Sequence, residues 1–233
     1  MMKKILSVDT SSKPCSVCIY DGIDFNEISV LLNKTHSETL IPLLEELKEN
    51  YKFKYDDIDY FAVNVGPGSF TGIRIGVSTI KGIASVSNKP CVSVSTLESL
   101  AYNLVGHNDS FVCPLIDARN DRFYFALFKL DGNEVERVLD DDVSNIDEII
   151  KKIIIYKNVF LVGDGAKDFF NKRPSDSYKL APEDKINQKS SSTAKAAIKY
   201  IEQSKFSSAD LVNPVYLRPS QAERELIQKE KKQ

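Results

Sequence analysis

Hydrophobic residues open the chain in three short runs separated by polar turns, a pattern that predicts a small antiparallel sheet. The strands are expected over 5–10, 16–20 and 25–32. The residues from Ser11 to Pro14 lie between the first two strands and favour a hairpin turn.

The next hydrophobic positions recur with the period of an α-helix. Thr35 and Glu38 have the spacing of a capping box. Pro42 is expected to kink this helix because it lacks an amide hydrogen. Four leucines share one helix face: Leu40, Leu43, Leu44 and Leu47. The elements expected next are a strand over 59–65, a helix over 69–86, a strand over 91–94 and a short helix from a Thr96 cap through 104.

The second half of the chain repeats this order. We expect strands over 111–117, 122–130 and 134–140, a helix over 146–154, a strand over 159–162, a helix over 166–171, an irregular stretch over 173–187 and a helix over 192–203 capped at Ser191 or Ser192. The predicted fold is therefore α/β with two lobes, each built on a β-β-β-α-β-α plan. The lobes are placed at 1–105 and 106–213, and 214–233 is expected to be a tail whose last dozen residues are solvated or frayed.

Two facing lobes of this plan are typical of the actin-like, Hsp70-like (ASKHA) class, in which a nucleotide binds between the lobes. In that class the first hairpin turn carries an acidic residue and small hydroxyl residues. Asp9, Thr10, Ser11 and Ser12 occupy this turn here. An ordinary β-turn explains the same residues equally well, because Asp, Ser and Thr favour turns.

The glycine-rich run over 66–76 is the strongest local motif. It matches neither the dinucleotide fingerprint nor the Walker loop. Gly66 and Gly68 are expected to adopt positive φ in a strand-to-helix turn, and such a turn presents amides that attract anions. A vestigial nucleotide site would use Asp9, Thr10, Ser11, Gly66, Gly68 and Thr71. The alternative is a tight turn onto a packed helix.

The helix over 69–86 carries small or apolar residues on two faces. One face holds Ile73, Val77, Ile80 and Ala84, and the other holds Gly72, Gly76, Thr79 and Ile83. Each helical glycine costs about 1 kcal/mol relative to alanine. We therefore predict that the glycine face receives another protein, together with the neighbouring helix. The predicted partner interface is His36, Leu40, Leu43, Leu44, Leu47, Gly72, Gly76, Thr79 and Ile83. Without its partner, such a surface is expected to form a homodimer.

Composition narrows the function. The 233 residues include 31 Lys and Arg against 33 Asp and Glu, so the net charge of −2 offers no basic surplus for independent nucleic-acid binding. The four cysteines, at positions 15, 18, 91 and 113, are expected to be buried thiols rather than a redox or zinc pair. With only two histidines, no metal site is expected. No apolar stretch is long enough for a membrane span, and the N-terminus lacks signal-peptide character, so a cytoplasmic protein is expected.

Several motifs, in order along nearly the whole chain, resemble the TsaB (YeaZ) family. They are residues 7–11, the helix start at 36–38 with Leu40 and Pro42, residues 66–76, residues 117–119 with Arg122 and Tyr124, and residues 214–218. The resemblance implies a non-catalytic, actin-like subunit that serves for dimerisation and docks through the two helices onto the catalytic subunit TsaD. An ATPase, TsaE, joins the complex. The complex transfers threonylcarbamoyl to the adenosine 3′ of the anticodon in tRNAs that read codons beginning with A, so tRNA is contacted only through the complex.

The residues themselves agree with the absence of catalytic activity that the resemblance implies. Catalytic relatives hold a metal with two histidines four residues apart, and here Leu40 stands four after His36. The second-lobe turn over 117–122 has no glycine, so Asp117, Arg119 and Arg122 are expected to form an ion network rather than a phosphate site. A residual adenosine-side turn is considered at 163–166. No cofactor is expected: the chain is expected to bind ATP or ADP at most weakly and not to hydrolyse it. The alternatives are an autonomous actin-like ATP-dependent phosphotransferase and a glycoprotease-type metallopeptidase.

Overall fold

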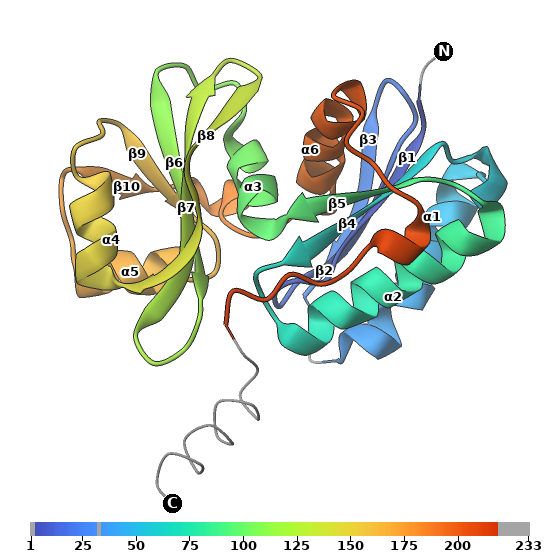
Figure 1. Ribbon diagram of the computed structural model, residues 1–233, viewed down its shortest axis with the longest axis horizontal. Coiled ribbons are helices and arrows are strands. Elements are labelled where there is room, and N and C mark those ends of the chain that lie inside the picture. Colours follow the sequence, from blue (N-terminus) through green and yellow to red (C-terminus); the bar gives the residue numbers. More distant parts are fainter. Residues whose placement is uncertain (1–2, 32–33, 219–233) are drawn as a thin grey trace, which may run out of the picture.

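A computed structural model describes residues 3–31 and 34–218, which form two lobes side by side (Figure 1). Of the tail expected over 214–233, residues 214–218 are described, and the last dozen residues, expected to be frayed, lie outside the described residues. The first lobe contains β1 (Ile5–Asp9), β2 (Cys15–Tyr20), β3 (Phe25–Val30), α1 (His36–Tyr51), β4 (Tyr60–Gly66), α2 (Phe70–Ser87), β5 (Cys91–Ser95) and α3 (Thr96–Ala101). The second half contains β6 (Ser110–Asp117), β7 (Arg122–Asp131), β8 (Glu134–Asn145), α4 (Ile146–Ile153), β9 (Val159–Val162), α5 (Ala166–Lys172), β10 (Tyr178–Leu180) and α6 (Ser190–Glu202).

The two sheets have the same strand order. The first is β3-β2-β1-β4-β5, and the second, taken from its β8 edge, is β8-β7-β6-β9-β10. In each, the first three strands pair antiparallel, and the last two continue in parallel with the first strand. Parallel neighbours need a crossover, which the intervening helices supply. The predicted repetition of one strand and helix plan in both halves is confirmed.

The last helix of each half packs on the sheet of the other. α3 contacts β6 and β7, whereas α6 contacts β1 and β2, and the two helices also touch each other (Figure 1). A hydrophobic cluster draws on both halves, from Ile5 and Val92 to Phe128 and Ala197. On its polar side, Glu98 of α3 bonds both Arg137 of β8 and the Tyr200 hydroxyl of α6, each at 2.8 Å. Within the lobe expected over 106–213, α6 therefore packs on the sheet of the first lobe.

Residues beyond α6 also return to the first lobe. Ser207 pairs with Cys91 at the edge of β5, and Ala209 and Val212 join the core beneath α2. The 3₁₀ turns at Tyr55–Asp57, Tyr102–Leu104, Glu183–Lys185 and Ala209–Leu211 link the longer elements.

Local expectations are mostly met. The Thr35–Glu38 capping box is present, and α1 continues through Pro42 to Tyr51. Gly66 and Gly68 adopt φ of 124° and 156°. All four cysteines are buried and free.

Three helix and strand assignments were wrong. α3 begins at Thr96, with Ser95 as its cap. α6 begins at Ser190 with Lys189 as its N-cap residue, because the hydroxyls of the expected caps, Ser191 and Ser192, bond Glu27 and Asn103 instead. The stretch expected to be irregular contains the short strand β10, whose three residues are too few to show a period.

Candidate functional site: the turns between the lobes and the outer helix face

The hairpin turn after β1 is organised around a buried carboxylate. Asp9 is 1% exposed and accepts three hydrogen bonds, from the Ser11 amide (2.9 Å), the Ser11 hydroxyl (2.6 Å) and Asn64 Nδ2 (2.6 Å). Burial raises the pKa of Asp9, and the hydrogen bonds oppose that shift only in part. Asn64 Oδ1 has no partner among the described residues. The hydrogen bonds of this carboxylate therefore stabilise the hairpin turn in which it lies.

The glycine-rich loop after β4 closes onto the same turn. The Ser69 amide donates to the Ser11 carbonyl at 2.7 Å, and the Gly72 amide donates to the Ser69 hydroxyl at 3.2 Å. A β-carbon at Gly68 would collide with the Ser11 carbonyl oxygen. Two amides that could receive an anion, those of Ser69 and Gly72, are thus used within the chain.

The glycine face of α2 also points inward. A β-carbon at Gly72 would collide with the Thr10 carbonyl, and one at Gly76 with Thr10 Oγ1. Thr10 Oγ1 donates to the Gly72 carbonyl at 2.7 Å. The prediction that these glycines leave room for a partner helix was wrong: they leave room for the chain's own β1 and its hairpin.

The leucine stripe of α1 is likewise internal. Leu40, Leu43, Leu44 and Leu47 are at most 5% exposed and pack with β1, β2 and α2 in the first-lobe core. Their expected role as partner surface was wrong for this reason. His36 is half-buried, and its Nε2 donates to the Ser12 carbonyl at 2.8 Å. Of the predicted interface, Thr79 and Ile83 are half-buried and remain in reach of a partner.

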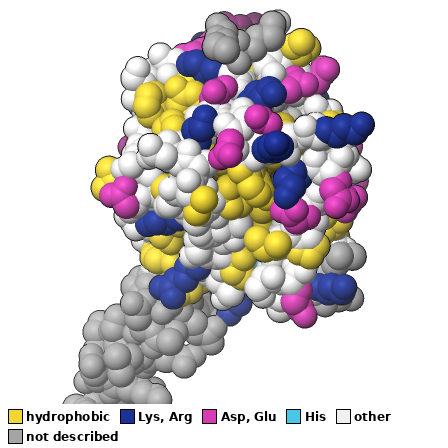
Figure 2. Space-filling view, turned by 90° about the vertical axis from the view of Figure 1, so that its right-hand side faces the viewer, with side chains coloured by type: hydrophobic (Ala, Val, Ile, Leu, Met, Phe, Trp, Pro, Cys, Tyr) yellow, Lys and Arg dark blue, Asp and Glu magenta, His cyan; other side chains and the backbone are white. Residues whose placement is uncertain are grey.

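The outward faces of these helices carry hydrophobic residues that sequence patterns missed. Ile41 of α1 is 51% exposed and Val86 of α2 is 91% exposed. Val86 and Ile83 line a shallow hollow of about 470 Å³ with Gly82 and Tyr55. Figure 2 shows hydrophobic side chains gathered at the centre of the first-lobe end, with charged side chains around them. The spacing from Thr79 through Ile83 to Val86 was the available signal.

The second lobe has matching turns at the same topological positions. Asp117 ends β6 as Asp9 ends β1, but it is exposed, and it accepts the Arg119 amide at 2.7 Å. In the turn between β9 and α5, the Gly165 amide donates to the Leu115 carbonyl at 3.0 Å and the Gly163 amide to Ile186 at 2.7 Å. A β-carbon at Gly165 would approach the Asp117 amide to 3.1 Å. The conceivable adenosine-side turn is therefore internally bonded.

Asp164 joins the turns of the two lobes. Its carboxylate accepts the Ser12 hydroxyl from the first lobe at 2.6 Å and the Asp117 amide from the second at 3.3 Å. Asp164 remains exposed, and partial removal of its carboxyl from water raises its pKa. A nucleotide between the lobes would have to break this bridge.

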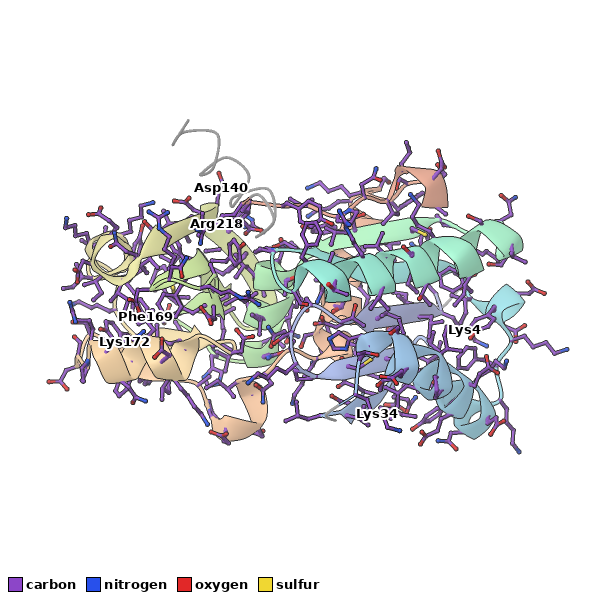
Figure 3. The ribbon with its side chains drawn as sticks, turned by 90° about the horizontal axis from the view of Figure 1, so that it is seen from below. Lys4, Lys34, Asp140, Phe169, Lys172 and Arg218 are labelled. Carbon is purple, nitrogen blue, oxygen red and sulfur yellow. The ribbon has the colours of Figure 1, made fainter. Side chains whose placement is uncertain are left out.

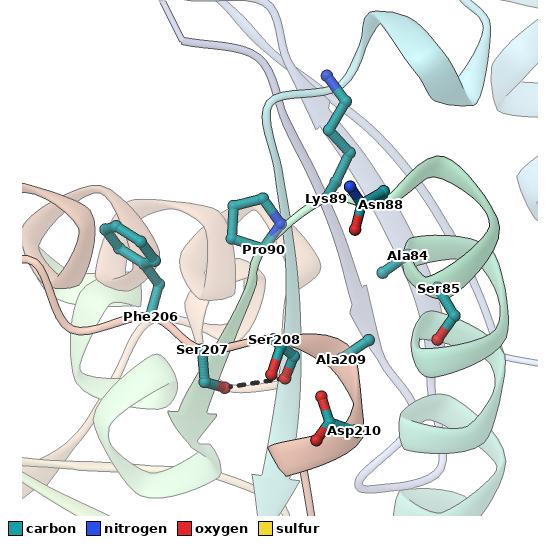
Figure 4. A pocket seen from close by; sticks show the side chains of 10 residues that line it. All are labelled: Ala84, Ser85, Asn88, Lys89, Pro90, Phe206, Ser207, Ser208, Ala209 and Asp210. Carbon is teal, nitrogen blue, oxygen red and sulfur yellow. Dashed lines mark hydrogen bonds between the residues drawn. The ribbon is translucent and has the colours of Figure 1, made fainter.

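Two further properties of the described residues concern metal binding and membrane spanning. Among the described residues, no cluster of three or more His, Cys, Asp or Glu side chains could hold a metal ion. Within the same part of the chain, none of the helices is both long and apolar enough to cross a membrane. A cavity of about 500 Å³ lies away from the turns, between the C-terminal end of α2 and residues 206–210 (Figure 4).

Comparison with known proteins gives consistent matches. Residues 30–212 match the family model described as TsaD, tRNA N6-adenosine threonylcarbamoyltransferase. The chain is 31% identical over 147 residues to the tRNA threonylcarbamoyladenosine biosynthesis protein TsaB of Escherichia coli, covering 60% of this chain and 64% of that protein. It is 33% identical over 138 residues to the TsaB of Bacillus subtilis, covering 59% and 60%. The matches span less than two thirds of the length of either relative.

The fold is shared with solved structures. YeaZ from Pseudomonas aeruginosa superposes with a TM-score of 0.82 at 23% identity, over 93% of this chain and 100% of that chain. A second Pseudomonas aeruginosa structure, described as an uncharacterized protein with similarity to peptidase YEAZ, gives a TM-score of 0.83.

Proposed function

This chain belongs to the TsaD family and, within it, to the TsaB group, and from that membership we propose that it is a non-catalytic scaffold subunit for tRNA threonylcarbamoyladenosine biosynthesis. Its partner is a TsaD-like catalytic subunit, which a TsaE-like ATPase joins. The assembled complex acts in the cytoplasm on the adenosine 3′ of the anticodon, and tRNA is contacted only through the complex.

The observation that carries this proposal is the Asp164 bridge. Ser12 and Asp117, from the turns that would surround a nucleotide's phosphates, both bond the same carboxylate. An actin-like enzyme needs these turns to present unpaired donors to phosphate. Here the amides of Ser69 and Gly165 are bonded to backbone carbonyls within the chain. The turns satisfy one another, which favours a structural role over phosphoryl transfer.

The docking face is assigned to the outward sides of α1 and α2. Ile41 and Val86 are large hydrophobic residues in water, with the hollow beside Ile83 available to a partner's side chain. A contiguous exposed hydrophobic patch marks a protein interface, and hydrophobic side chains gather on this end of the molecule (Figure 2). Without TsaD, the same face is expected to pair two copies of this chain.

The test is titration calorimetry with a purified TsaD-like subunit. Val86→Glu places a carboxylate in the proposed interface and should weaken binding about 30-fold. The matched control is Ile155→Glu, since Ile155 is 76% exposed but lies after α4 in the second lobe. Binding of the Val86→Glu chain at wild-type strength would refute the docking face.

A separate assay tests the missing chemistry. The isolated chain should bind ATP at most weakly and release no phosphate from it. Sub-micromolar ATP affinity or turnover by the isolated chain would instead support the phosphotransferase alternative.

A further inference from the structure

The segment from Asn213 to Arg218 runs along the first lobe beside the glycine-rich loop (Figure 1). The Val215 amide donates to the Val65 carbonyl, at the end of β4, at 2.7 Å. The Tyr216 ring stacks on Phe70 with centroids 4.4 Å apart, and its hydroxyl accepts Arg74 Nε at 2.8 Å. Backbone and side chain together hold this segment to the start of α2.

The same segment ends on the second lobe. Arg218 Nη1 donates to the Ala118 carbonyl at 2.8 Å, in the turn between β6 and β7. Figure 3 shows Arg218 over the second lobe. The turn that it reaches contains three consecutive left-handed residues, Arg119, Asn120 and Asp121, at φ of 62°, 56° and 53°. Left-handed backbone is costly for residues with side chains, so this turn depends on its contacts.

A glycine marks the fit between the segment and the loop. Gly66 adopts φ of 124°, and a β-carbon there would collide with the Val215 carbonyl. Glycine at position 66 thus allows residues 213–218 to pack directly against the start of the glycine-rich loop.

We propose that residues 213–218 are a latch that couples the hairpin turns of the two lobes and limits their relative movement. The α3–α6 contacts join the lobes through their helices, whereas the latch joins them through their turns. Its second-lobe end is the Arg218–Ala118 contact, so it can release locally while the cores stay folded. Release would free the second-lobe turn and loosen the Ser12–Asp164 bridge. This proposal is independent of the proposed function.

The first test replaces Arg218 in the full chain. Arg218→Met keeps most of the side-chain length and removes the hydrogen bond to Ala118. Amide exchange of Ala118 should accelerate about fivefold, since one hydrogen bond to a charged donor is lost. Arg173→Met is the control, because Arg173 forms an exposed ion pair with Asp147 inside the second lobe.

The second test measures the lobes directly. Spin labels at Glu46→Cys and Lys151→Cys report the distance between α1 and α4, and the four native cysteines are buried and do not compete. Arg218→Met should broaden the distance distribution, and Val215→Pro, which removes the donor to Val65, should broaden it further. Near-ultraviolet circular dichroism verifies that each variant is folded. If Val215→Pro unfolds, Arg218→Met alone decides the outcome. An unchanged distribution and unchanged Ala118 exchange in Arg218→Met would overturn the latch.

Discussion

The two lobes share one strand order but differ at the corresponding turn. In the first lobe the acid that ends β1, Asp9, is buried and accepts three hydrogen bonds. In the second lobe the equivalent Asp117 is exposed, and the three residues from Arg119 to Asp121 adopt positive φ. Hydrophobic patterning thus preserves the sheet in both halves, while the turns at the strand ends are free to diverge.

The loops that follow the fourth strand of each lobe teach a second lesson. Both donate a helix-start amide to a carbonyl of the adjacent β-strand or hairpin, Ser69 to Ser11 and Gly165 to Leu115. The lobes therefore differ in the burial of the acid that ends the first strand. In both lobes, however, the loop after the fourth strand is hydrogen-bonded to the neighbouring strand or hairpin. Three pairs of substitutions separate these shared and divergent features.

The largest effect is expected where α2 meets the first-lobe turn. Gly76→Arg would force a charged side chain against Thr10, Val8 and Val63, so the free energy of unfolding should fall by at least about 4 kcal/mol. Gly82→Arg on the same helix is the control, because a β-carbon at Gly82 meets no atom within 4 Å. Urea unfolding measures both.

This outcome reverses a natural expectation from sequence, that Gly76→Arg would spare the monomer and block only a partner. A folded Gly76→Arg chain with wild-type stability would show that α2 can move away from β1.

An intermediate effect is expected at the two acids that occupy equivalent positions, Asp9 and Asp117. Because burial raises the pKa of Asp9 above its unfolded value, the stability that this group contributes is fully present below the unfolded pKa and is lost as pH rises through the folded pKa. Asp9→Asn removes that loss, and Asn64 can turn its unpartnered Oδ1 toward the new amide. At pH 7 the variant should be about 1 kcal/mol more stable than the wild type.

The comparison with the second lobe sharpens this prediction. Asp117→Asn, at the exposed acid, should change the free energy of unfolding by less than about 0.5 kcal/mol. Urea titrations at pH 4 and pH 7 should show a pH-dependent gain for Asp9→Asn only. A loss of several kcal/mol in Asp9→Asn at pH 7 would contradict the assigned environment.

The smallest effect is expected in the second-lobe turn. Asn120→Gly relieves one left-handed residue at φ of 56° and should raise the free energy of unfolding by about 0.5 kcal/mol, after the entropy cost of glycine. Ser12→Gly, in the first-lobe turn, should instead be destabilising, since the hydroxyl bond to Asp164 is lost. Thermal unfolding resolves the two signs, and a destabilised Asn120→Gly chain would argue against strain in this turn.

Sequence patterns predicted the repeated strands and helices, the positive φ of Gly66 and the buried cysteines. They did not predict which neighbour each hydrophobic or small-residue stripe contacts. Leu44 and Gly76 lie on stripes that suit either a partner or the chain's own sheet, and periodicity does not distinguish these two neighbours. The inward role of Gly76 depends on Thr10, 66 residues earlier, which only the tertiary fold brings into contact. The reach of α6 to the first sheet is equally non-local.

The reciprocal placement of α3 and α6 has a consequence for any attempt to divide the molecule. A fragment ending near residue 105 would lack the cover over β1 and β2, and the remaining fragment would lack the cover over β6 and β7. Each half supplies a helix to the sheet of the other, so we expect neither half to fold alone. The chain should melt in one cooperative transition, and co-expressed halves should be recovered only as a pair.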